Sequence, residues 1–265
     1  MADDKTARIK TAIRNNFDES AVHYQEFEDR YGFFQGLTDT LVARMSPRTG
    51  ADILDVGCGT GSSSAHILRL VPDSRVWGLD NSAPMLAMAR SRLGDEKRLS
   101  FVEGDAADLG EYFDFPFDAI LYSASIFLIP DYPESLREAR ALLKNGGHVG
   151  LTIMDGLYDT DGKSMLAQAD QEAQEGVSLK KAVAIPAFVS LFQKIFPRQR
   201  SWVEDLRLPK ELLTDFFSVP AMSAGLFPKI EYSERVRKVA RLFDHLPKTE
   251  HHFRWIFMVG EVGER

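Results

Sequence analysis

A strand-like run that ends in three closely spaced glycines constrains the fold of this chain more than any other feature. The run reads Ile53-Leu54-Asp55-Val56-Gly57-Cys58-Gly59-Thr60-Gly61. Apolar residues on both sides of Asp55 suit a strand that is covered on both faces, as in a parallel sheet. The glycines lack the Cβ atoms that would block a ligand, and the serines at 62–64 favour a helix start. The sequence therefore predicts a strand, a ligand-binding turn and a helix whose first amides face the ligand.

The glycine spacing separates two kinds of cofactor. A dinucleotide-binding turn has the spacing G-x-G-x-x-G and receives a pyrophosphate at the helix N-terminus. Here the spacing is G-x-G-x-G, and Asp55 precedes it by two residues. The segment Leu54–Gly61 resembles motif I of the class I S-adenosylmethionine-dependent methyltransferases, whose cofactor carries no phosphate. The resemblance implies that Asp55, Gly57, Gly59 and Gly61 bind the cofactor.

Two further strand-like runs repeat the pattern of that family in the expected order. The first, Arg75–Asp80, ends in a carboxylate 19 positions after the last glycine. We expect Asp80 to accept hydrogen bonds from both ribose hydroxyls. The second, Leu99–Ala106, resembles the third strand of the family and its turn. The resemblance implies Asp105 near the adenine amine, and the main-chain amide of Ala106 near a ring nitrogen.

The fourth and fifth strands follow. The run Phe117–Ala124 is predicted to be the fourth strand, and its end at Tyr122–Ser125 is expected to border the methyl-transfer site. Ser123 is taken from this end as a cofactor contact. A turn at Leu142–Gly147 leads into a fifth strand over His148–Met154.

The matching core, about Ala51 to Met154, resembles the methyltransferases of the ubiquinone- and biotin-pathway type. That group shares the sequence pattern D-x-S-x-x-M-L, which residues Asp80 to Leu86 match. The resemblance implies Asn81 and Met85 as secondary cofactor contacts, with Met85 as an apolar wall for adenine. Each of the two also suits a plainer role, as a helix start and as a core residue.

Composition narrows the substrate class. The 265-residue chain has a net charge of −7 and a pI near 5.5, whereas proteins that grip phosphates present a basic face. It also lacks an N-P-P-[YF]-like segment, which related enzymes use to hold a nucleobase or amide nitrogen. We therefore expect a small-molecule acceptor and no nucleic acid.

The cellular location and metal content are also predicted. No apolar stretch approaches the length of a membrane span, and the polar start Met1–Lys5 does not resemble a signal peptide. These features predict a cytoplasmic protein without membrane insertion. Cys58 is the single cysteine, and His251-His252 lack a third ligand at suitable spacing, so no metal site is expected.

The segment before the core, residues 1–50, is expected to form a helical cap over the cofactor edge. Apolar residues recur at helical spacing over Thr6–Met45. In similar enzymes a tyrosine near this place closes over the methionine end of the cofactor, which suggests Tyr24. His23 is the weaker candidate for a general base. The alternatives are a packing aromatic and a surface histidine.

The segment after the core, residues 156–208, is too long for a simple connection and is predicted to be a helical lid. Helical periodicity covers Met165–Glu175 and Leu179–Phe196. One or two of its aromatic rings are expected to reach the pocket, although such rings are more often core residues. The apolar side of the segment comprises Phe188, Leu191, Phe192, Ile195, Phe196 and Trp202.

The remainder, residues 209–265, is predicted to contain the last helix, which starts near Leu208–Leu213, and a closing hairpin. Its strands are expected at Lys229–Val236 and Phe253–Gly260. With the core at 51–155, the prediction is one α/β domain. It contains a Rossmann-like, seven-stranded, doubly wound sheet with an antiparallel last strand, a helical N-terminal segment and the lid.

Three functions are compatible with these residues. The resemblance favours transfer of a methyl group from S-adenosylmethionine to a small molecule, with S-adenosylhomocysteine as product. The reaction would depend mainly on positioning in a lidded pocket. The alternatives are an enzyme of the same fold with another reaction, an NAD-dependent oxidoreductase among them, and a regulatory module without turnover. The acceptor, its methylated atom and the oligomeric state are left open.

Overall fold

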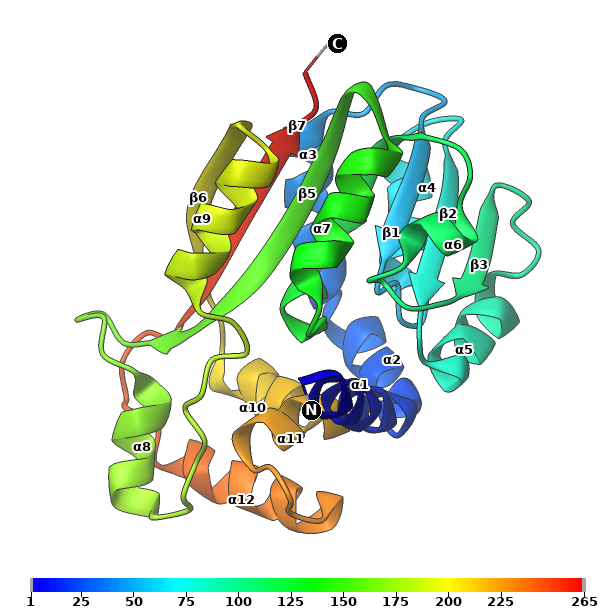
Figure 1. The fold of residues 1–265 in the computed structure, drawn as a ribbon. Coiled ribbons are helices and arrows are strands. Elements are labelled where there is room, and N and C mark those ends of the chain that lie inside the picture. The colour runs from blue at the N-terminus through cyan, green and yellow to red at the C-terminus, as the bar shows by residue number, and fades with distance from the viewer. Residues whose placement is uncertain (1, 264–265) are drawn as a thin grey trace.

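Seven strands form one sheet in the order β3-β2-β1-β4-β5-β7-β6, with helices on both faces (Figure 1). The structure is a computed structural model that describes residues 2–263; Met1 and residues 264–265, at the outer ends of the first and last predicted segments, lie outside the described residues. Strands β1 to β5 pair in parallel, and β7 runs antiparallel to both of its neighbours. The predicted seven-stranded sheet is therefore confirmed. The strands are β1 Asp52–Val56, β2 Arg75–Asp80, β3 Leu99–Glu103, β4 Phe117–Tyr122, β5 Leu143–Tyr158, β6 Arg198–Arg207 and β7 His252–Glu261.

The first four strands lie where the sequence predicts them, and their register brings their carboxyl ends to one edge. Ile53 on β1 pairs with Val76 on β2 and with Ala119 on β4. β5 is longer than predicted, because its antiparallel pairing with β7 extends from His148 to Tyr158.

Helices pack on both faces of the sheet, and the buried side chains on each face form an apolar cluster. The successive residues Ile53 and Leu54 are both fully buried, and they belong to opposite clusters because strand side chains alternate. One cluster includes side chains of α3, α4, α10 and α12, and the other includes side chains of α6, α7 and α9. The helices are α1 Ala2–Asp18, α2 Ala21–Tyr31, α3 Phe33–Met45, α4 Ser62–Leu70, α5 Ala83–Leu93, α6 Leu109–Tyr112, α7 Tyr132–Leu142, α8 Met165–Ala173, α9 Ile185–Ile195, α10 Lys210–Ser218, α11 Pro220–Leu226 and α12 Tyr232–Asp244, with a 3-10 turn η1 at Ile126–Leu128.

The predicted sixth strand at Lys229–Val236 is wrong. This segment leads into α12, whose buried residues Val239, Leu242 and Phe243 continue a helical spacing beyond the alternating stretch. Eight residues are too few to distinguish the two-residue period of a strand from the 3.6-residue period of a helix. The longer segment up to Phe243 shows the helical period. There is consequently no closing hairpin: three helices, α10 to α12, separate β6 from β7.

The actual sixth strand, β6, lies at the end of the segment predicted to be a lid. It is an edge strand that is rich in charged residues, which is typical of sheet edges. Its Trp202 ring stacks on Phe257 of β7, with centroids 5.3 Å apart and an interplanar angle of 18°. The helices α8 and α9 confirm the predicted helical periodicity, but the prediction of a helical insertion over 156–208 is wrong at its end, where β6 lies.

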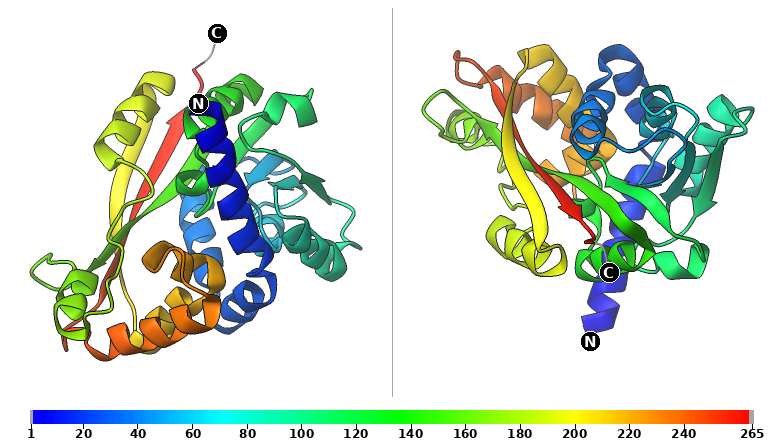
Figure 2. Two further views of the ribbon diagram at one scale, coloured as in Figure 1. Left: turned by 60° about the horizontal axis from the view of Figure 1, so that its bottom comes forward. Right: turned by 90° about the horizontal axis from the view of Figure 1, so that it is seen from above.

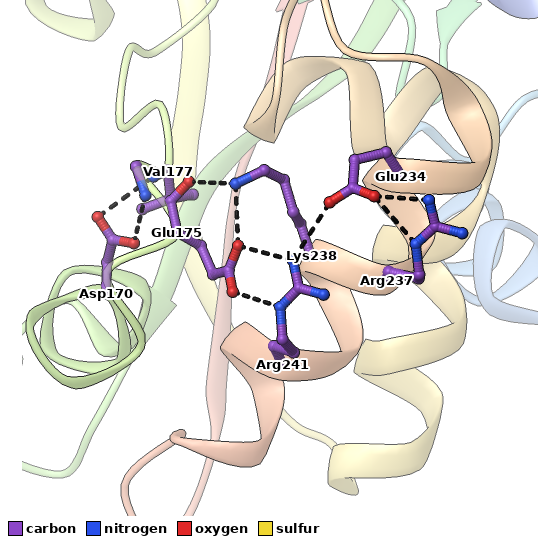
Figure 3. A network of polar contacts seen from close by, with 8 residues as sticks. Asp170, Glu175, Val177, Glu234, Arg237, Lys238 and Arg241 are labelled. Atoms are coloured by element: carbon purple, nitrogen blue, oxygen red, sulfur yellow. Dashed lines mark hydrogen bonds and ion pairs between the residues drawn. The ribbon is translucent and has the colours of Figure 1, made fainter.

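A charged cluster fastens the segment after α8 to α12 (Figure 3). The carboxylate of Glu175 accepts hydrogen bonds from Lys238 Nζ at 2.9 Å and from Arg241 Nε at 2.5 Å. Arg241 also donates to Glu234 at 3.3 Å. These hydrogen bonds lower the pKa of Glu175 to about 2. The cluster therefore ties two segments more than 60 residues apart in the chain.

Among the helices of residues 2–263, none combines the length and apolar character that a membrane crossing requires.

Candidate active site

A cavity opens where strands β1 to β4 end, which is the edge at which α/β sheets of this kind bind ligands. Helices α1, α2 and α11 contribute to its other walls, and α1 lies across this edge of the sheet in Figure 2. The lining residues are Lys10, Ile13, Phe17, Tyr24, Phe34, Gly57, Gly59, Leu79, Asp80, Asn81, Met85, Gly104, Asp105, Ala106, Ser123, Ala124, Ser125, Leu128, Ile129, Pro130 and Met222.

The glycine turn after β1 is held in place by its neighbours. Gly57 has φ +72°, a conformation that L side chains rarely adopt, and its amide donates to the carbonyl of Leu79 at 2.7 Å. A Cβ at this position would lie 2.5 Å from the Cβ of Ser125. Ser125 in turn donates its hydroxyl to the carbonyl of Val56 at 2.5 Å. Glycine is therefore required for the close approach of the β1 and β4 ends.

Two predicted cofactor residues, Gly61 and Asp55, do not line the cavity. Gly61 directly precedes α4, and a Cβ at this position would lie 2.8 Å from the Phe101 ring. Glycine is therefore needed here because Phe101 packs against it. Asp55 is buried beside the start of α4, where Ser64 donates to its carboxylate at 2.6 Å. Burial raises the pKa of Asp55 to about 7, against the effect of the Ser64 hydrogen bond. Both residues belong to the sequence motif, but the motif does not show that they face away from the cavity.

Asp80 lies at the end of β2 and lines the cavity beside Asn81 and Met85. Its two carboxylate oxygens accept one main-chain hydrogen bond each, from Gly59 at 2.8 Å and from Ser82 at 2.9 Å. Burial raises the pKa of Asp80, and these amides oppose that effect. Each oxygen retains acceptor capacity, because a carboxylate offers about four lone-pair positions.

Asp105 and Ala106 also line the cavity, and Asp105 has a partner that the sequence did not predict. The ammonium of Lys10, on α1, lies 2.7 Å from Asp105 Oδ2 and 2.8 Å from Asp131 Oδ2. Burial opposes the charged form of Lys10, but the hydrogen bonds to the two carboxylates prevail and raise its pKa. A lysine on an amphipathic helix gives no sequence signal for such a bridge.

Of the two candidates on α2, the structure brings only Tyr24 to the cavity. Its ring stacks on Phe34, with centroids 4.8 Å apart, and it faces the glycine turn, since a Cβ on Gly59 would lie 4.0 Å from Tyr24 Cε1. Burial raises the pKa of Tyr24 well above its usual value, so the phenol stays neutral.

The prediction of His23 as a general base is contradicted by its position. Its side chain is 48% exposed, and its Nδ1 lies 3.6 Å from Glu26 outside the cavity. Adjacent helix residues point about 100° apart. Since Tyr24 faces the cavity, its neighbour His23 is turned away from it.

The residues directly after β4, Ser123, Ala124 and Ser125, border the cavity. Ser123 Oγ lies 3.0 Å from the hydroxyl of Thr38 on α3. Tyr122 points away from the cavity, and its hydroxyl lies 2.8 Å from Ser135 Oγ.

The predicted lid does not cover the cavity. No residue of 156–208 lines it. The rings of Phe188, Phe192 and Phe196 are fully buried in the cluster formed with α6 and α7. Instead, the cover comes from α1 and α11, which contact each other, and from the segment after β4. Met222 of α11 could not be found from the sequence, because about 100 residues separate it from the strand ends.

The structure provides no obvious metal centre: within residues 2–263, no group of three or more His, Cys, Asp or Glu side chains is placed to hold an ion.

Comparison with known proteins identifies the class. A family model described as a methyltransferase domain matches residues 53–147. The trans-aconitate 2-methyltransferase of Deinococcus radiodurans is 35% identical over 114 residues, 43% of this chain and 42% of that protein. A demethylmenaquinone methyltransferase of Staphylococcus aureus is 30% identical over 152 residues, 56% of this chain and 62% of that protein. The matches thus span less than two thirds of either relative.

Solved structures share the fold. A Haemonchus contortus phosphoethanolamine N-methyltransferase 2, in complex with S-adenosylhomocysteine, aligns with a TM-score of 0.54 at 22% identity, covering 86% of this chain and 52% of that one. The [4+2]-cyclase SpnF aligns with a TM-score of 0.57 at 18% identity, covering 87% and 81%.

The fold and the glycine-turn cavity define a Rossmann-like α/β domain with a cavity at the carboxyl ends of its strands. More particularly, residues 53–147 belong to the class I S-adenosylmethionine-dependent methyltransferases.

Proposed function

We propose that this chain binds S-adenosylmethionine in the cavity and transfers its methyl group to a small-molecule acceptor. The observation that carries the proposal is the convergence of Gly57, Gly59, Asp80 and Asp105 on one cavity, from three different strand ends. Gly59, Asp80 and Asp105 are more than 20 residues apart from one another in the sequence, and the sheet brings them together. The relatives are named for two different acceptors, trans-aconitate and demethylmenaquinone, so they do not select one for this chain.

The residues suit the parts of the cofactor. Asp80 accepts from the ribose hydroxyls through the lone pairs that its two main-chain bonds leave free. Asp105, the amide of Ala106 and the Met85 side chain receive the adenine. Gly57, Gly59 and Tyr24 enclose the methionine end, next to Ser123 at the end of β4. Asp55 acts indirectly: by accepting a hydrogen bond from Ser64, it holds the start of α4 next to the end of β1.

Catalysis then depends on positioning and on exclusion of water. The cofactor supplies a methyl group that is already activated by its sulfonium. A lone pair of the acceptor attacks the methyl carbon in line, and the electrons of the broken carbon–sulfur bond go to sulfur. Apolar side chains of α1, α3 and α11 line the cavity and keep water away from this step. Tyr24, a neutral phenol, contributes shape and a hydroxyl, and no base is assigned to it.

The proposal is tested with methyl-labelled S-adenosylmethionine and a cell extract that is separated into small-molecule and macromolecular fractions. Label in a small molecule is expected. Label only in protein or RNA would contradict the acceptor class. In a parallel calorimetric titration, Asp80→Ala should weaken cofactor binding by about 1–3 kcal/mol, the value of charge-assisted hydrogen bonds. The exposed Asp95→Ala serves as the matched control.

One observation keeps a second function in view. The [4+2]-cyclase SpnF has a similar fold, so this fold also occurs in a protein named for another reaction. Cofactor binding without any label transfer would favour that alternative, or a regulatory module.

A further inference from the structure

The charged side chains that line the cavity either form ion pairs with each other or belong to the part of the cavity assigned to the cofactor. Within the described chain, the charged residues of its lining are Lys10, Asp80 and Asp105. Lys10 is shared between Asp105 and Asp131, at 2.7 and 2.8 Å. Asp80 accepts two main-chain amides and is assigned to the ribose. No charge is left over for an acceptor.

The rest of the lining is mainly apolar: its two serines are paired, and its uncharged side-chain groups without a hydrogen-bond partner in the described chain are the Tyr24 hydroxyl and the Asn81 amide. Ser125 donates to a main-chain carbonyl, and Ser123 pairs with Thr38. The remaining wall is made by side chains from α1, α3, α11 and the segment after β4. These are Ile13, Phe17, Phe34, Leu128, Ile129 and Met222.

We propose that the acceptor is an uncharged, mainly apolar small molecule, which lies against Phe34, Ile129 and Met222 and reacts in its neutral form. This inference rests on the proposed function and adds the chemical class of the substrate. An acceptor with a carboxylate or phosphate would lose its hydration here without gaining a cation, which is strongly unfavourable. A cationic amine would find no free carboxylate at this end. An apolar ring or chain is stabilised by burial, and a single neutral amine, thiol or hydroxyl group is enough to attack the methyl carbon, with the electrons of the carbon–sulfur bond going to sulfur and the proton of the attacking group going to solvent.

The test compares three probes of nearly equal shape on the full chain saturated with S-adenosylhomocysteine. The probes are 2-naphthol (neutral), 2-naphthoate (anionic) and 2-naphthylmethylamine (cationic at pH 7), with binding followed by calorimetry. We expect 2-naphthol to bind at least tenfold more tightly than either charged probe. Equal or tighter binding of a charged probe would overturn the proposal, and so would absence of 2-naphthol binding to the cofactor-loaded protein.

A charge inserted into the wall tests the location. Met222→Lys should weaken 2-naphthol binding at least tenfold and increase the affinity for 2-naphthoate. Val203→Lys, at a 55% exposed position of β6 outside the cavity, should change neither. Unchanged probe preferences in Met222→Lys would overturn the assignment of this wall, provided that the variant still binds S-adenosylhomocysteine. Failure of the wild-type chain to bind S-adenosylhomocysteine would instead count against the proposed function, and the two failures are thereby distinguished.

Discussion

The ammonium of Lys10 lies 2.7 Å from a carboxylate oxygen of Asp105, so helix α1 is joined directly to the turn that follows β3. The same ammonium reaches Asp131, on the segment after β4, at 2.8 Å. One side chain of the N-terminal helix thus connects the turn after β3 with the start of α7. The first helix is part of the site, although it lies outside the matched domain at residues 53–147.

Lys10→Met should loosen α1 over the cavity and increase the dissociation rate of S-adenosylmethionine roughly fivefold, as expected from about 1 kcal/mol for partly exposed ion pairs. Stopped-flow displacement of the cofactor measures this rate. Lys5→Met, on an exposed face of the same helix, is the control and should leave the rate unchanged. Equal rates in the wild-type protein and Lys10→Met would show that the bridge does not retain the cofactor.

Gly57→Ala should reduce the free energy of unfolding by about 2–5 kcal/mol, because a left-handed backbone and an overlap with Ser125 are both imposed. Gly146→Ala separates the two causes. Gly146 has φ +74° but no atom within 4 Å of the added Cβ, so a loss of only about 1–2 kcal/mol is expected. Denaturant unfolding of both variants provides the comparison. A similar loss in both would mean that contact with Ser125 is unimportant.

Asp55 should make the protein less stable as pH rises. Burial raises its pKa from 3.8 to about 7, so between these values the folded state holds a proton that the unfolded state releases. Stability therefore falls with increasing pH across this interval. Asp55→Asn removes this titration and should flatten the dependence, so that its stability relative to the wild type rises from pH 5 to pH 7.5. Unfolding free energies at both pH values decide the matter, and parallel curves would contradict the prediction.

Glu175→Gln should lower the free energy of unfolding by about 1–2 kcal/mol at pH 7, because two charged donors lose their carboxylate. The pKa of Glu175 is lowered from 4.5 to about 2, so its contribution is complete above pH 4.5 and is lost as pH falls toward 2. The difference between variant and wild type should shrink accordingly. Glu172→Gln, on exposed Glu172 of α8, should cost less than about 0.5 kcal/mol. A difference that stayed constant between pH 4.5 and 3 would argue against the ionised cluster.

The core of the site could be predicted because its signals are local. Each signal, a glycine turn after an apolar strand or a carboxylate at a strand end, lies within one strand and the turn that follows it, and the parallel order of the strands brings these turns to one edge of the sheet. Gly57, Gly59, Asp80 and Asp105 accordingly line the cavity as expected. The direction in which a residue faces was less predictable: Asp55 belongs to the same local pattern, yet its carboxylate lies behind the turn, beside Ser64.

The prediction that residues 156–208 cover the site was wrong, because it rested only on the helical spacing of apolar residues. The aromatic residues of α9 do lie at helical spacing, but Phe188, Phe192 and Phe196 are buried in the core and do not reach the cavity. A helical stripe of rings shows that one side of a helix is buried, and it does not show against what. The charged strand β6 was missed because an edge strand is stabilised by its neighbour's main chain more than by apolar alternation.

The sequence alone determined the class of fold, the positions of strands β1 to β4 and the residues of the glycine turn, because these depend on backbone conformation and short-range burial. The tertiary structure decided which helices cover the cavity, the bridge from Lys10 to Asp105, and the position of Met222 in its wall. These contacts join residues about 100 positions apart. Such distant pairs leave no local pattern in one sequence, since they are selected by how whole helices pack on the sheet.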